Sequence, residues 1–517
     1  MNHVPFTGRD PQDAGPQYLE DLATGYWFSL SLFTAVEAGL FGLLEPAGKT
    51  LDEISSALGF TREGTDRFLH VLCSMGLLVC DGPHYFNSRI SSDYLIAGKD
   101  NYQGDAVLWR KDLIAQWSGI KDCLEVGGRI VKGSGQEDPA VLFQRRRKYI
   151  RAMDCTAKTK VREMFPLFEG CSLGGEMLDV GAGSGAVAAG FLDRFPSLNA
   201  TLLDIPEILE HTRDFIRERG LCKRTDFCAA NVLDPWPVEK GRFDFIMLSN
   251  IIHAYSEKEL LHILAEAVRC LKEDGLLMIH DFFFEHFPEK AALFDLNMFI
   301  NTYNGRVFSE RDVREKLALM NLHVTGLLPL GTDTALIIAS KKAEALTQLH
   351  IDKKAQLSAK IRALGFRDLF IIPVDTIHIP GWTDMRCRFG CGHFGKPNCP
   401  PHAPSPGKTR DFIKDYAFAL LLEGEPPTKD FQARILQAER EAFNAGFYKA
   451  FSYWAGPCSL CPSCAEDGIC RNTKDARPSM EGAGIDVFET AKRAGSTLRT
   501  LDKKDDFVKY FGLILLE

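Results

Sequence analysis

The segment that most constrains the fold is GEMLDVGAGSGAVAAGFLDRFPSLNATLLDIPE, which spans residues 175–207. Its apolar beginning, MLDV, predicts a buried strand, which runs into Gly181, Gly183 and Gly185 before an apolar helix. Glycine lets the backbone turn tightly and approach a ligand closely, and the helix N-terminus presents a positive dipole end. A second apolar stretch ends in Asp204, where a carboxylate can accept both hydroxyls of a ribose. This order of elements predicts a Rossmann-like α/β domain that binds a nucleoside.

The acid that opens the glycine turn indicates which nucleoside is bound. Asp179 begins the pattern D-x-G-x-G-x-G, whereas dinucleotide sites usually read G-x-G-x-x-G with no acid at this place. The pattern resembles motif I of class I S-adenosylmethionine-dependent methyltransferases. Residues 231–284, from NVLDPW to HDFFF, extend the resemblance to the small-molecule O-methyltransferases related to the caffeate and hydroxyneurosporene enzymes. The resemblance covers roughly residues 15–340 and implies a methyltransferase domain over residues 101–340.

The resemblance implies a place for S-adenosylmethionine, residue by residue. Asp204 would bind the ribose hydroxyls, and Asn231 and Val232 would lie beside the adenine. The family usually has an acid at the position of Asn231, so one adenine contact changes while a hydrogen-bonding side chain is kept. The methionine and ribose part of the cofactor would be lined by Asp179, Gly181, Gly183 and Gly185.

His253, in SNIIHAY, matches the general base of the family. Methyl transfer from a sulfonium needs an in-line nucleophile, and an imidazole with its ordinary pKa of about 6.5 can take the proton of an acceptor hydroxyl. The family's acid after this histidine is replaced by Ala254, so a second family acid, Asp281, is expected to orient the imidazole. The loss of the neighbouring acid leaves the acceptor atom (O, N, S or C) open. Asn297 and Met298 fall where the family lines its acceptor pocket, although a core role fits them equally well.

The N-terminal block predicts a winged-helix domain over residues 15–100. Apolar positions at helical spacing predict a helix over residues 19–45, a capping box at Thr50 begins a short second helix, and residues 62–76 predict a third. A hairpin around an Asp-Gly turn follows. DNA binding is disfavoured, because the net charge is −8 and the third helix holds few cations. The apolar first helix needs a partner surface, and the resemblance implies dimerisation, so we expect a homodimer.

Cysteines mark a third block, over residues 355–517. The chain has 15 cysteines, and seven of them crowd into its last third. The stretches DLFIIPVD, FALLLEG and FGLILLE predict strands with a helix between them, and therefore a small α/β domain. Clustered exposed thiols without ligands would be a liability, so we interpret these cysteines as metal ligands. They form two sets, the first being Cys387, Cys391 and Cys399, and the second Cys458, Cys461, Cys464 and Cys470.

The spacing within the second set favours iron–sulfur over zinc. Zinc sites usually combine two C-x2-C pairs, whereas three cysteines at successive x2 spacing wrap one corner of a cuboidal cluster. We therefore expect one [4Fe–4S] cluster, with a fourth ligand from Cys470 or from the first set, and zinc as the alternative metal. A second cluster with an open iron on the first set is a further alternative, in which the remaining position is left for His393, His402, Cys470, solvent or a substrate atom. The block resembles a family described only as predicted metal-binding, which implies metal binding and says little about the reaction.

The whole sequence predicts a cytoplasmic enzyme. Charged residues make up 25% and apolar residues 45%, no run of about 18 apolar residues predicts a membrane span, and MNHVPFTGRDPQD lacks a signal-peptide pattern. We expect a dimeric S-adenosylmethionine-dependent methyltransferase that acts on a small molecule and carries a fused iron–sulfur domain. The alternative is a redox or metal-carrier protein whose methyltransferase half binds the cofactor as a regulator. Neither hypothesis includes a nucleic acid or a membrane as partner.

Overall fold

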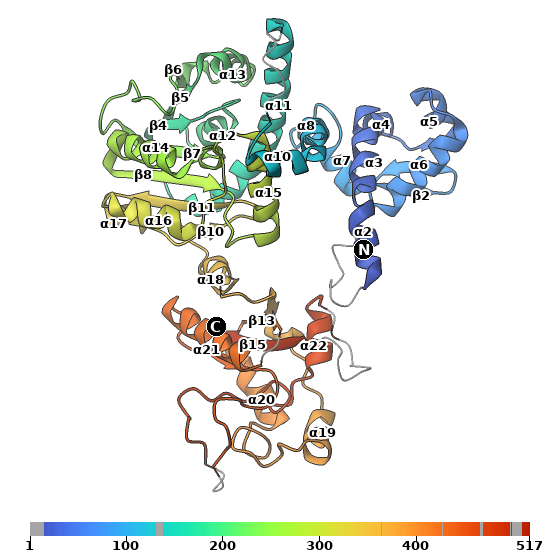
Figure 1. Cartoon of the computed structure of the whole chain (residues 1–517), viewed down its shortest axis with the longest axis vertical. Helices are drawn as coiled ribbons and strands as arrows, with labels where there is room; N and C mark the ends of the chain where they lie inside the picture. Colours follow the sequence, from blue (N-terminus) through green and yellow to red (C-terminus); the bar gives the residue numbers. More distant parts are fainter. Residues whose placement is uncertain are drawn as a thin grey trace. The chain divides into compact units, whose positions relative to one another are not determined.

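The structure is a computed structural model that describes residues 15–130, 138–362, 364–425, 428–465, 469–496, 498 and 509–517. The chain divides into two compact units, Met1–Ile351 and Asp352–Glu517. Figure 1 shows the course of the chain through both units, from the blue N-terminal helices to the red C-terminal strand. In the described residues the first unit has two sheets and the second has one, and each unit has a hydrophobic core of its own.

The first unit begins with helices and a three-stranded antiparallel sheet in the order β1-β3-β2, the last two strands forming the predicted wing. Thr50 and Glu53 form the predicted capping box at the start of α5. The single helix predicted over residues 19–45 is wrong, because the chain forms three helices there and Gly39 takes a left-handed φ of 69° between the last two. The elements are α2 (Pro16–Thr24), α3 (Tyr26–Glu37), α4 (Leu40–Leu43), β1 (Lys49–Thr50), α5 (Leu51–Leu58), α6 (Arg62–Ser74), β2 (Leu78–Asp81), β3 (His84–Asn87) and α7 (Arg89–Tyr94).

A run of helices joins this part to the large sheet. Asp138 caps the long helix α11 by accepting the backbone N–H of Ala140 at 2.8 Å, and a proline follows the cap at the first helical position. Helix α8 packs against both α3 and α11, so α8 links the two parts of the unit. The helices are α8 (Gly104–Asp112), α9 (Ile114–Ser118), α10 (Ile120–Val126) and α11 (Pro139–Met164).

The large sheet has eight strands in the described residues, in the order β10-β11-β8-β7-β4-β5-β6, with β9 also paired to β11. Strands β4 to β8 are parallel, and β11 closes the sheet antiparallel to β8. The strands are β4 (Gly175–Val180), β5 (Leu198–Asp204), β6 (Thr225–Ala229), β7 (Phe243–Ser249), β8 (Leu271–Asp281), β9 (His323–Val324), β10 (Leu328–Pro329) and β11 (Ala335–Ser340). The helices between and after them are α12 (Ala186–Arg194), α13 (Pro206–Glu218), α14 (Glu257–Cys270), α15 (Pro288–Asn301), α16 (Glu310–Leu319) and α17 (Ala343–Leu346).

The topology of this sheet determines where a ligand can bind. Strand β5 lies on one side of β4 and β7 on the other, so the direction of strand order reverses at β4. Open α/β sheets bind ligands outside the carboxyl ends of their strands at this reversal. Four buried rings with neighbouring centroids 5.0 to 6.1 Å apart pack α12 against β7, namely Phe168, Phe191, Phe195 and Phe245.

The second unit is built on an antiparallel four-stranded sheet in the order β12-β13-β15-β14. Successive side chains of β13 point to opposite faces, so Leu420 and Leu422 enter one core while Ala419 and Leu421 enter the other. This confirms the small α/β domain that the sequence predicted. Its elements are α18 (Lys353–Arg362), β12 (Asp368–Pro373), α19 (Trp382–Gly390), α20 (Pro406–Phe412), β13 (Phe418–Gly424), α21 (Thr428–Asn444), β14 (Phe451–Tyr453), α22 (Val487–Arg493) and β15 (Tyr510–Leu516).

Among the described residues, none of the helices is both long enough and apolar enough to span a bilayer.

Candidate functional site

The glycine turn follows β4 at the reversal of the strand order. Gly181, Gly183 and Gly185 have left-handed φ angles of 67°, 55° and 74°. A Cβ atom on Gly181 would lie 2.1 Å from Cδ1 of Ile251, so the residues after β7 pack tightly on the turn. A Cβ atom on Gly183 would meet nothing within 4 Å. The turn is therefore packed on one side and open on the other, as close approach of a ligand to the backbone requires.

Two carboxylates flank this turn. Asp179 is buried and accepts a hydrogen bond from the backbone N of Ala188 at 3.2 Å, and burial raises its pKa to about 7. Asp204 ends β5 and accepts the backbone N–H groups of Gly183 at 2.9 Å and Ile205 at 2.8 Å, while burial raises its pKa as well. A carboxylate offers about four lone-pair sites, so Asp204 retains about two for hydroxyl donors.

Asn231 and Val232 lie on the loop after β6, beside Asp204. The backbone N of Ala230 donates to the carbonyl of Asp204 at 3.0 Å, which holds this loop at the end of β5. Val232 is buried, whereas Asn231 is exposed and its Oδ1 accepts the backbone N–H of Leu233 at 3.0 Å. The Asn231 side chain therefore stabilises its own turn at the edge of the candidate site.

Sequence reasoning missed Asn250, the residue that follows β7. It has a left-handed φ of 52°, and its backbone N donates to the carbonyl of His280 at 2.7 Å. Its Oδ1 atom is buried and has no hydrogen-bond partner within the described ranges. A buried acceptor without a partner costs about 1–3 kcal/mol, so a ligand that donates to Oδ1 would recover this free energy. A polar residue directly after an apolar strand of a parallel sheet is the signal that could have identified it.

His253 and Asp281 meet at the ends of β7 and β8. His253 lies on the 3-10 helix η4 (Ile252–Ala254), and its Nδ1 is 2.6 Å from Oδ1 of Asp281. Asp281 is fully buried and also accepts the backbone N–H groups of His253 at 3.3 Å and Phe282 at 2.8 Å. A carboxylate beside Nδ1 favours the tautomer with hydrogen on Nδ1, which leaves Nε2 with its lone pair. The structure thus brings the two sequence-predicted catalytic residues into direct contact.

Aromatic rings surround the imidazole. Phe294, on α15, lies edge-on to His253 with a centroid distance of 4.9 Å, and Phe282 stacks on Phe294 at 3.7 Å. These rings restrict the orientation of the imidazole and shield one side of it from water, since Phe282 is buried.

Asn297 and Met298 are both buried on α15. Oδ1 of Asn297 accepts the indole N–H of Trp117 on α9 at 3.0 Å and the side-chain amide of Asn301 at 3.0 Å. Asn297 therefore connects α9 with α15, the helix that also carries Phe294. A contact of either side chain with an acceptor stays a prediction.

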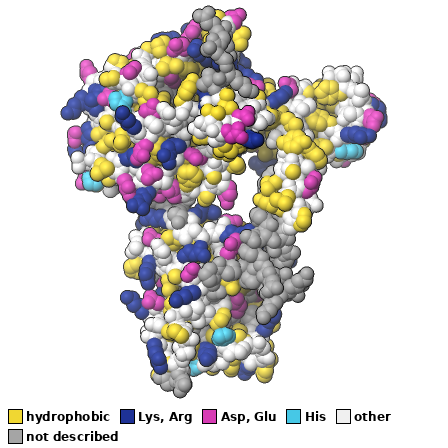
Figure 2. Space-filling model, in the orientation of Figure 1, with side chains coloured by type: hydrophobic (Ala, Val, Ile, Leu, Met, Phe, Trp, Pro, Cys, Tyr) yellow, Lys and Arg dark blue, Asp and Glu magenta, His cyan; other side chains and the backbone are white. Residues whose placement is uncertain are grey.

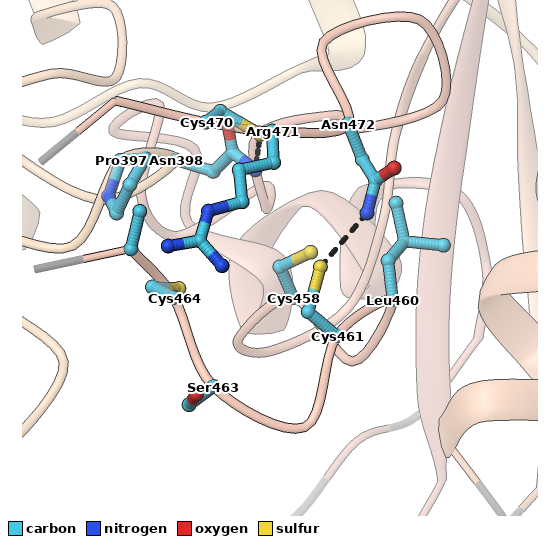
Figure 3. A pocket seen from close by; sticks show the side chains of 11 residues that line it. Pro397, Asn398, Cys458, Leu460, Cys461, Ser463, Cys464, Cys470, Arg471 and Asn472 are labelled. Atoms are coloured by element: carbon cyan, nitrogen blue, oxygen red, sulfur yellow. Dashed lines mark hydrogen bonds between the residues drawn. The ribbon is translucent and has the colours of Figure 1, made fainter.

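The second set of cysteines lines a narrow pocket in the second unit (Figure 3). The side-chain amide of Asn472 donates to Sγ of Cys461 at 2.8 Å, and the amide of Asn398 lies 3.9 Å from Sγ of Cys470. The side chain of Arg471 lines the same pocket. Amide donors and a guanidinium stabilise thiolates, so this is the chemistry that a metal–thiolate site needs. The pocket contains all four cysteines of the set, Cys458, Cys461, Cys464 and Cys470.

The first set lies close to the second in the fold. Burial, followed by neighbouring thiols of both sets such as Cys391 and Cys464, raises the pKa of Cys399 to about 11. Sγ of Cys387 lies 3.9 Å from the carbonyl oxygen of Glu481, which places Cys387 beside residues 477–482. Over the described part of the chain, no three His, Cys, Asp or Glu side chains are close enough to hold a metal ion. The proximity of the two sets follows from the fold, whereas their ligation of a metal stays a prediction.

Comparisons with known families cover most of the chain. Residues 137–320 match a family model described as an O-methyltransferase domain, and residues 20–97 match the O-methyltransferase dimerisation domain. The first unit belongs to the O-methyltransferase family. Residues 370–516 match a family described as "Predicted metal-binding protein (DUF2284)", which agrees with the cysteine sets. The resemblances inferred from the sequence are therefore confirmed for both units.

Curated relatives of the O-methyltransferase unit share a quarter of their residues with it. The 3-hydroxy-5-methyl-1-naphthoate 3-O-methyltransferase of Streptomyces sahachiroi is 27% identical over 315 residues, which are 59% of this chain and 88% of that protein. The acetylserotonin O-methyltransferase of Bos taurus is 26% identical, over 59% of this chain and 91% of that protein. Both matches span less than two thirds of this chain.

A solved structure of human N-acetylserotonin methyltransferase in complex with SAM has the same fold as this O-methyltransferase unit. The TM-score is 0.56 at 22% identity, over 65% of this chain and 100% of that chain. The structure entitled "PigF with SAH" gives a TM-score of 0.55 at 19% identity, over 63% of this chain and 99% of that chain. At this level of identity the likeness concerns the fold.

Proposed function

We propose that the chain transfers a methyl group from S-adenosylmethionine to a hydroxyl of a small molecule, with His253 as general base. The observation that carries this proposal is the 2.6 Å contact between Nδ1 of His253 and Oδ1 of Asp281, beside the glycine turn. The family of the first unit and the fold neighbours, two of which were solved with SAM or SAH, support the reaction class.

The residues around the glycine turn fit S-adenosylmethionine. Gly183 exposes its backbone to open space, and Asp204 keeps lone pairs for two ribose hydroxyls. Asn250 Oδ1 is a buried acceptor without a partner among the described residues, and Asp179 is a buried carboxyl that a cation would help to ionise. S-adenosylmethionine has two ribose hydroxyls and an ammonium group. These groups would donate hydrogen bonds to the acceptors around the turn. Asn231 and Val232 would then lie at the adenine end.

The chemistry needs a nucleophile that loses its proton during attack. Bound S-adenosylmethionine supplies an electrophilic methyl group on a sulfonium. Nε2 of His253 accepts the hydroxyl proton of the acceptor while the oxygen–methyl bond forms and the sulfur–methyl bond breaks, and the proton then leaves to solvent. Asp281 holds the imidazole through Nδ1 and stabilises the imidazolium that results. Asp281 thereby supplies the carboxylate that Ala254 cannot supply.

The experiment is a turnover assay on the full-length protein with S-adenosylmethionine and a panel of phenols, hydroxy-naphthoates and N-acylated hydroxyindoles. Formation of S-adenosylhomocysteine and of a methyl ether is expected with at least one member of the panel. The same assay with His253→Ala should show a loss of at least about a hundredfold. Tight binding of S-adenosylmethionine without turnover on hydroxyl, amine and thiol panels would favour the regulator hypothesis over the enzyme.

The N-terminal part offers a surface for a second copy of the chain. Figure 2 shows hydrophobic side chains gathered over α2 and α3, which is where the dimerisation family matches. Scattered exposed apolar residues are ordinary, but a contiguous apolar face marks an interface. We infer a homodimer through this face, whose exposed members are Leu19, Leu22, Tyr26, Trp27 and Leu30.

For the second unit we propose one [4Fe–4S] cluster held by Cys458, Cys461 and Cys464, with zinc as the alternative metal. The pocket that contains these thiols, and the amide of Asn472 on Cys461, support thiolate ligation at this place. Burial raises the pKa of Cys458, so metal binding must displace its proton and should weaken as the pH falls. The fourth ligand would be Cys470 or a cysteine of the first set.

A further inference from the structure

Gln432 is a buried glutamine on α21 that the reaction and the metal site described above leave without a role. The residue is 0% exposed, although glutamine usually lies at the surface. Its Nε2 donates to the carbonyl oxygens of Ala455 at 3.2 Å and Pro457 at 3.0 Å. Its Oε1 accepts the backbone N–H of Ser459 at 3.0 Å and the hydroxyl of the same residue at 2.8 Å. A glutamine amide has two N–H donors and two lone pairs, so these four hydrogen bonds use its whole capacity.

The four hydrogen bonds enclose Cys458, the first cysteine of the second set. Pro457 and Ser459 are its neighbours in the chain, so the amide of Gln432 holds the backbone on both sides of this cysteine. Cys458 also packs against the hydrophobic core to which α21 contributes Phe431. The thiol of Cys458 therefore stands on a backbone that the protein itself keeps in place.

The same helix also holds the chain after the cysteines of the second set. Glu439 lies seven residues after Gln432, which is two helical turns along the same side of α21. Its Oε2 accepts the Nε–H of Arg477 at 2.9 Å, and the side chains of this ion pair are only 12% and 16% exposed. Arg477 in turn donates to the carbonyl oxygen of Lys474 at 3.2 Å. The three remaining cysteines of the second set lie in the chain between these two anchors on α21.

We propose that Gln432 is a positioning residue of the metal site in the second unit, which holds Cys458 where its thiol binds the metal. This inference rests on the metal site proposed above. A ligand that its surroundings already hold loses little conformational freedom when the metal binds, so the site binds the metal more tightly than a mobile loop would. Gln432 does not bind the metal itself, because the segment 455–459 occupies both of its polar atoms.

The test compares Gln432→Met with the wild-type full-length protein, both purified without oxygen. Methionine is unbranched like glutamine and similar in volume, so the substitution removes the four hydrogen bonds and leaves the packing nearly unchanged. Iron and zinc are measured in the purified protein, and a chelator is then added to follow release of the metal. Loss of a residue that orients a metal ligand typically lowers metal affinity about 10–100-fold, so Gln432→Met should release its metal faster by about this factor.

Gln437→Met is the matched control, because Gln437 lies on the same helix but is exposed. The control should release its metal at the wild-type rate. A wild-type rate in Gln432→Met, or equal acceleration in both glutamine variants, would overturn the proposal. Ser459→Ala keeps the test decisive if Gln432→Met does not fold, because it removes only the hydroxyl bond to Gln432. Release should then be faster than in the wild type but slower than in a variant without all four bonds, and no acceleration would contradict the proposal.

Alkylation of the thiols separates positioning of Cys458 from a general loss of stability. Protein stripped of metal under reducing conditions is treated briefly with iodoacetamide, and mass spectrometry gives the modified fraction of each cysteine. In Gln432→Met, Cys458 should react faster than in the wild type. Cys470, in the same pocket, and Cys387, in the first set, should keep their wild-type rates. Equal acceleration at all three cysteines would mean that the whole unit is loosened, and would overturn the positioning role.

Metal analysis of the wild-type protein separates this inference from the metal site on which it rests. Wild-type protein that holds iron or zinc, together with wild-type release in Gln432→Met, would contradict the role of Gln432 alone. Wild-type protein that holds neither metal after purification without oxygen would contradict the metal site, and the role of Gln432 with it.

Discussion

Nδ1 of His253 lies 2.6 Å from Oδ1 of Asp281, although the two residues are 28 positions apart in the chain. Two backbone N–H groups, from His253 and Phe282, bind the same carboxylate and fix its orientation. An acid next to the histidine in sequence is therefore unnecessary at Ala254, because the end of β8 supplies one in space.

We expect His253→Ala to lower kcat by about 10²–10⁴, as loss of a general base does, with S-adenosylmethionine affinity nearly unchanged. Asp281→Asn should lower kcat comparably, because an amide can present N–H to Nδ1 and reverse the tautomer. Asp274→Asn is the control, since Asp274 lies on the same strand but is exposed. Steady-state kinetics measures kcat, and calorimetry measures the affinity for S-adenosylmethionine. Full turnover in His253→Ala would mean that the acceptor needs no base.

Asp204→Ala should weaken S-adenosylmethionine binding at least about tenfold, because hydrogen bonds to a charged group contribute about 1.5–3 kcal/mol each. Asp204→Asn should be intermediate, since one oxygen still accepts. Asp226→Ala on the neighbouring strand β6, where the carboxylate is exposed, should bind normally. Calorimetry with S-adenosylmethionine alone measures these affinities. Wild-type affinity in Asp204→Ala would show that this carboxylate does not bind the cofactor.

Asp179 should make the unliganded methyltransferase unit less stable as the pH rises. Burial raises its pKa from 3.8 to about 7, so the unfolded chain releases this proton earlier than the folded one. Across the window from about pH 4 to pH 7 the loss is about 1.4 kcal/mol per pH unit from this group. Asp179→Asn should abolish that dependence and raise the melting temperature at pH 8. Asp193→Asn, at an exposed position of α12, should keep the wild-type dependence.

Cys461→Ser should remove the metal of the second unit, because a hard alkoxide ligates an iron–sulfur cluster poorly. Protein purified without oxygen should be brown and hold about four irons per chain, and the variant should lose both the colour and the iron. S-adenosylmethionine binding should survive, since the first unit has its own core. Cys222→Ser, an exposed cysteine of the first unit, should keep the metal. A colourless native protein with one zinc would contradict the cluster.

Trp27→Asp should convert the homodimer into a monomer in light scattering. Trp27 is 58% exposed on α3, and a buried charge without a partner would oppose association of this apolar face. Leu319→Asp is the control, because Leu319 is 83% exposed on α16, away from the N-terminal helices. A dimer that persists in Trp27→Asp but not in Leu319→Asp would place the interface elsewhere.

Much of the fold was predictable because the signals were local. The apolar strands, the three glycines and the acid at the end of β5 predicted the parallel sheet and its ligand end, since strand ends in such a sheet meet at one edge. The capping box at Thr50 was also correct, because it depends on four consecutive residues. The single helix over residues 19–45 was wrong, because apolar spacing cannot show that the left-handed Gly39 divides it.

The sequence by itself determined most helices and strands, the glycine turn and the two sets of cysteines, because each of these depends on residues close together in the chain. Only the tertiary structure decided that Asp281 contacts His253, that Oδ1 of Asn250 has no hydrogen-bond partner among the described residues, and that the ammonium of Lys160 on α11 lies over the Phe282 ring. These relationships join β7, β8 and α11 across many residues. They arise from strand order and helix packing, which a one-dimensional pattern does not contain.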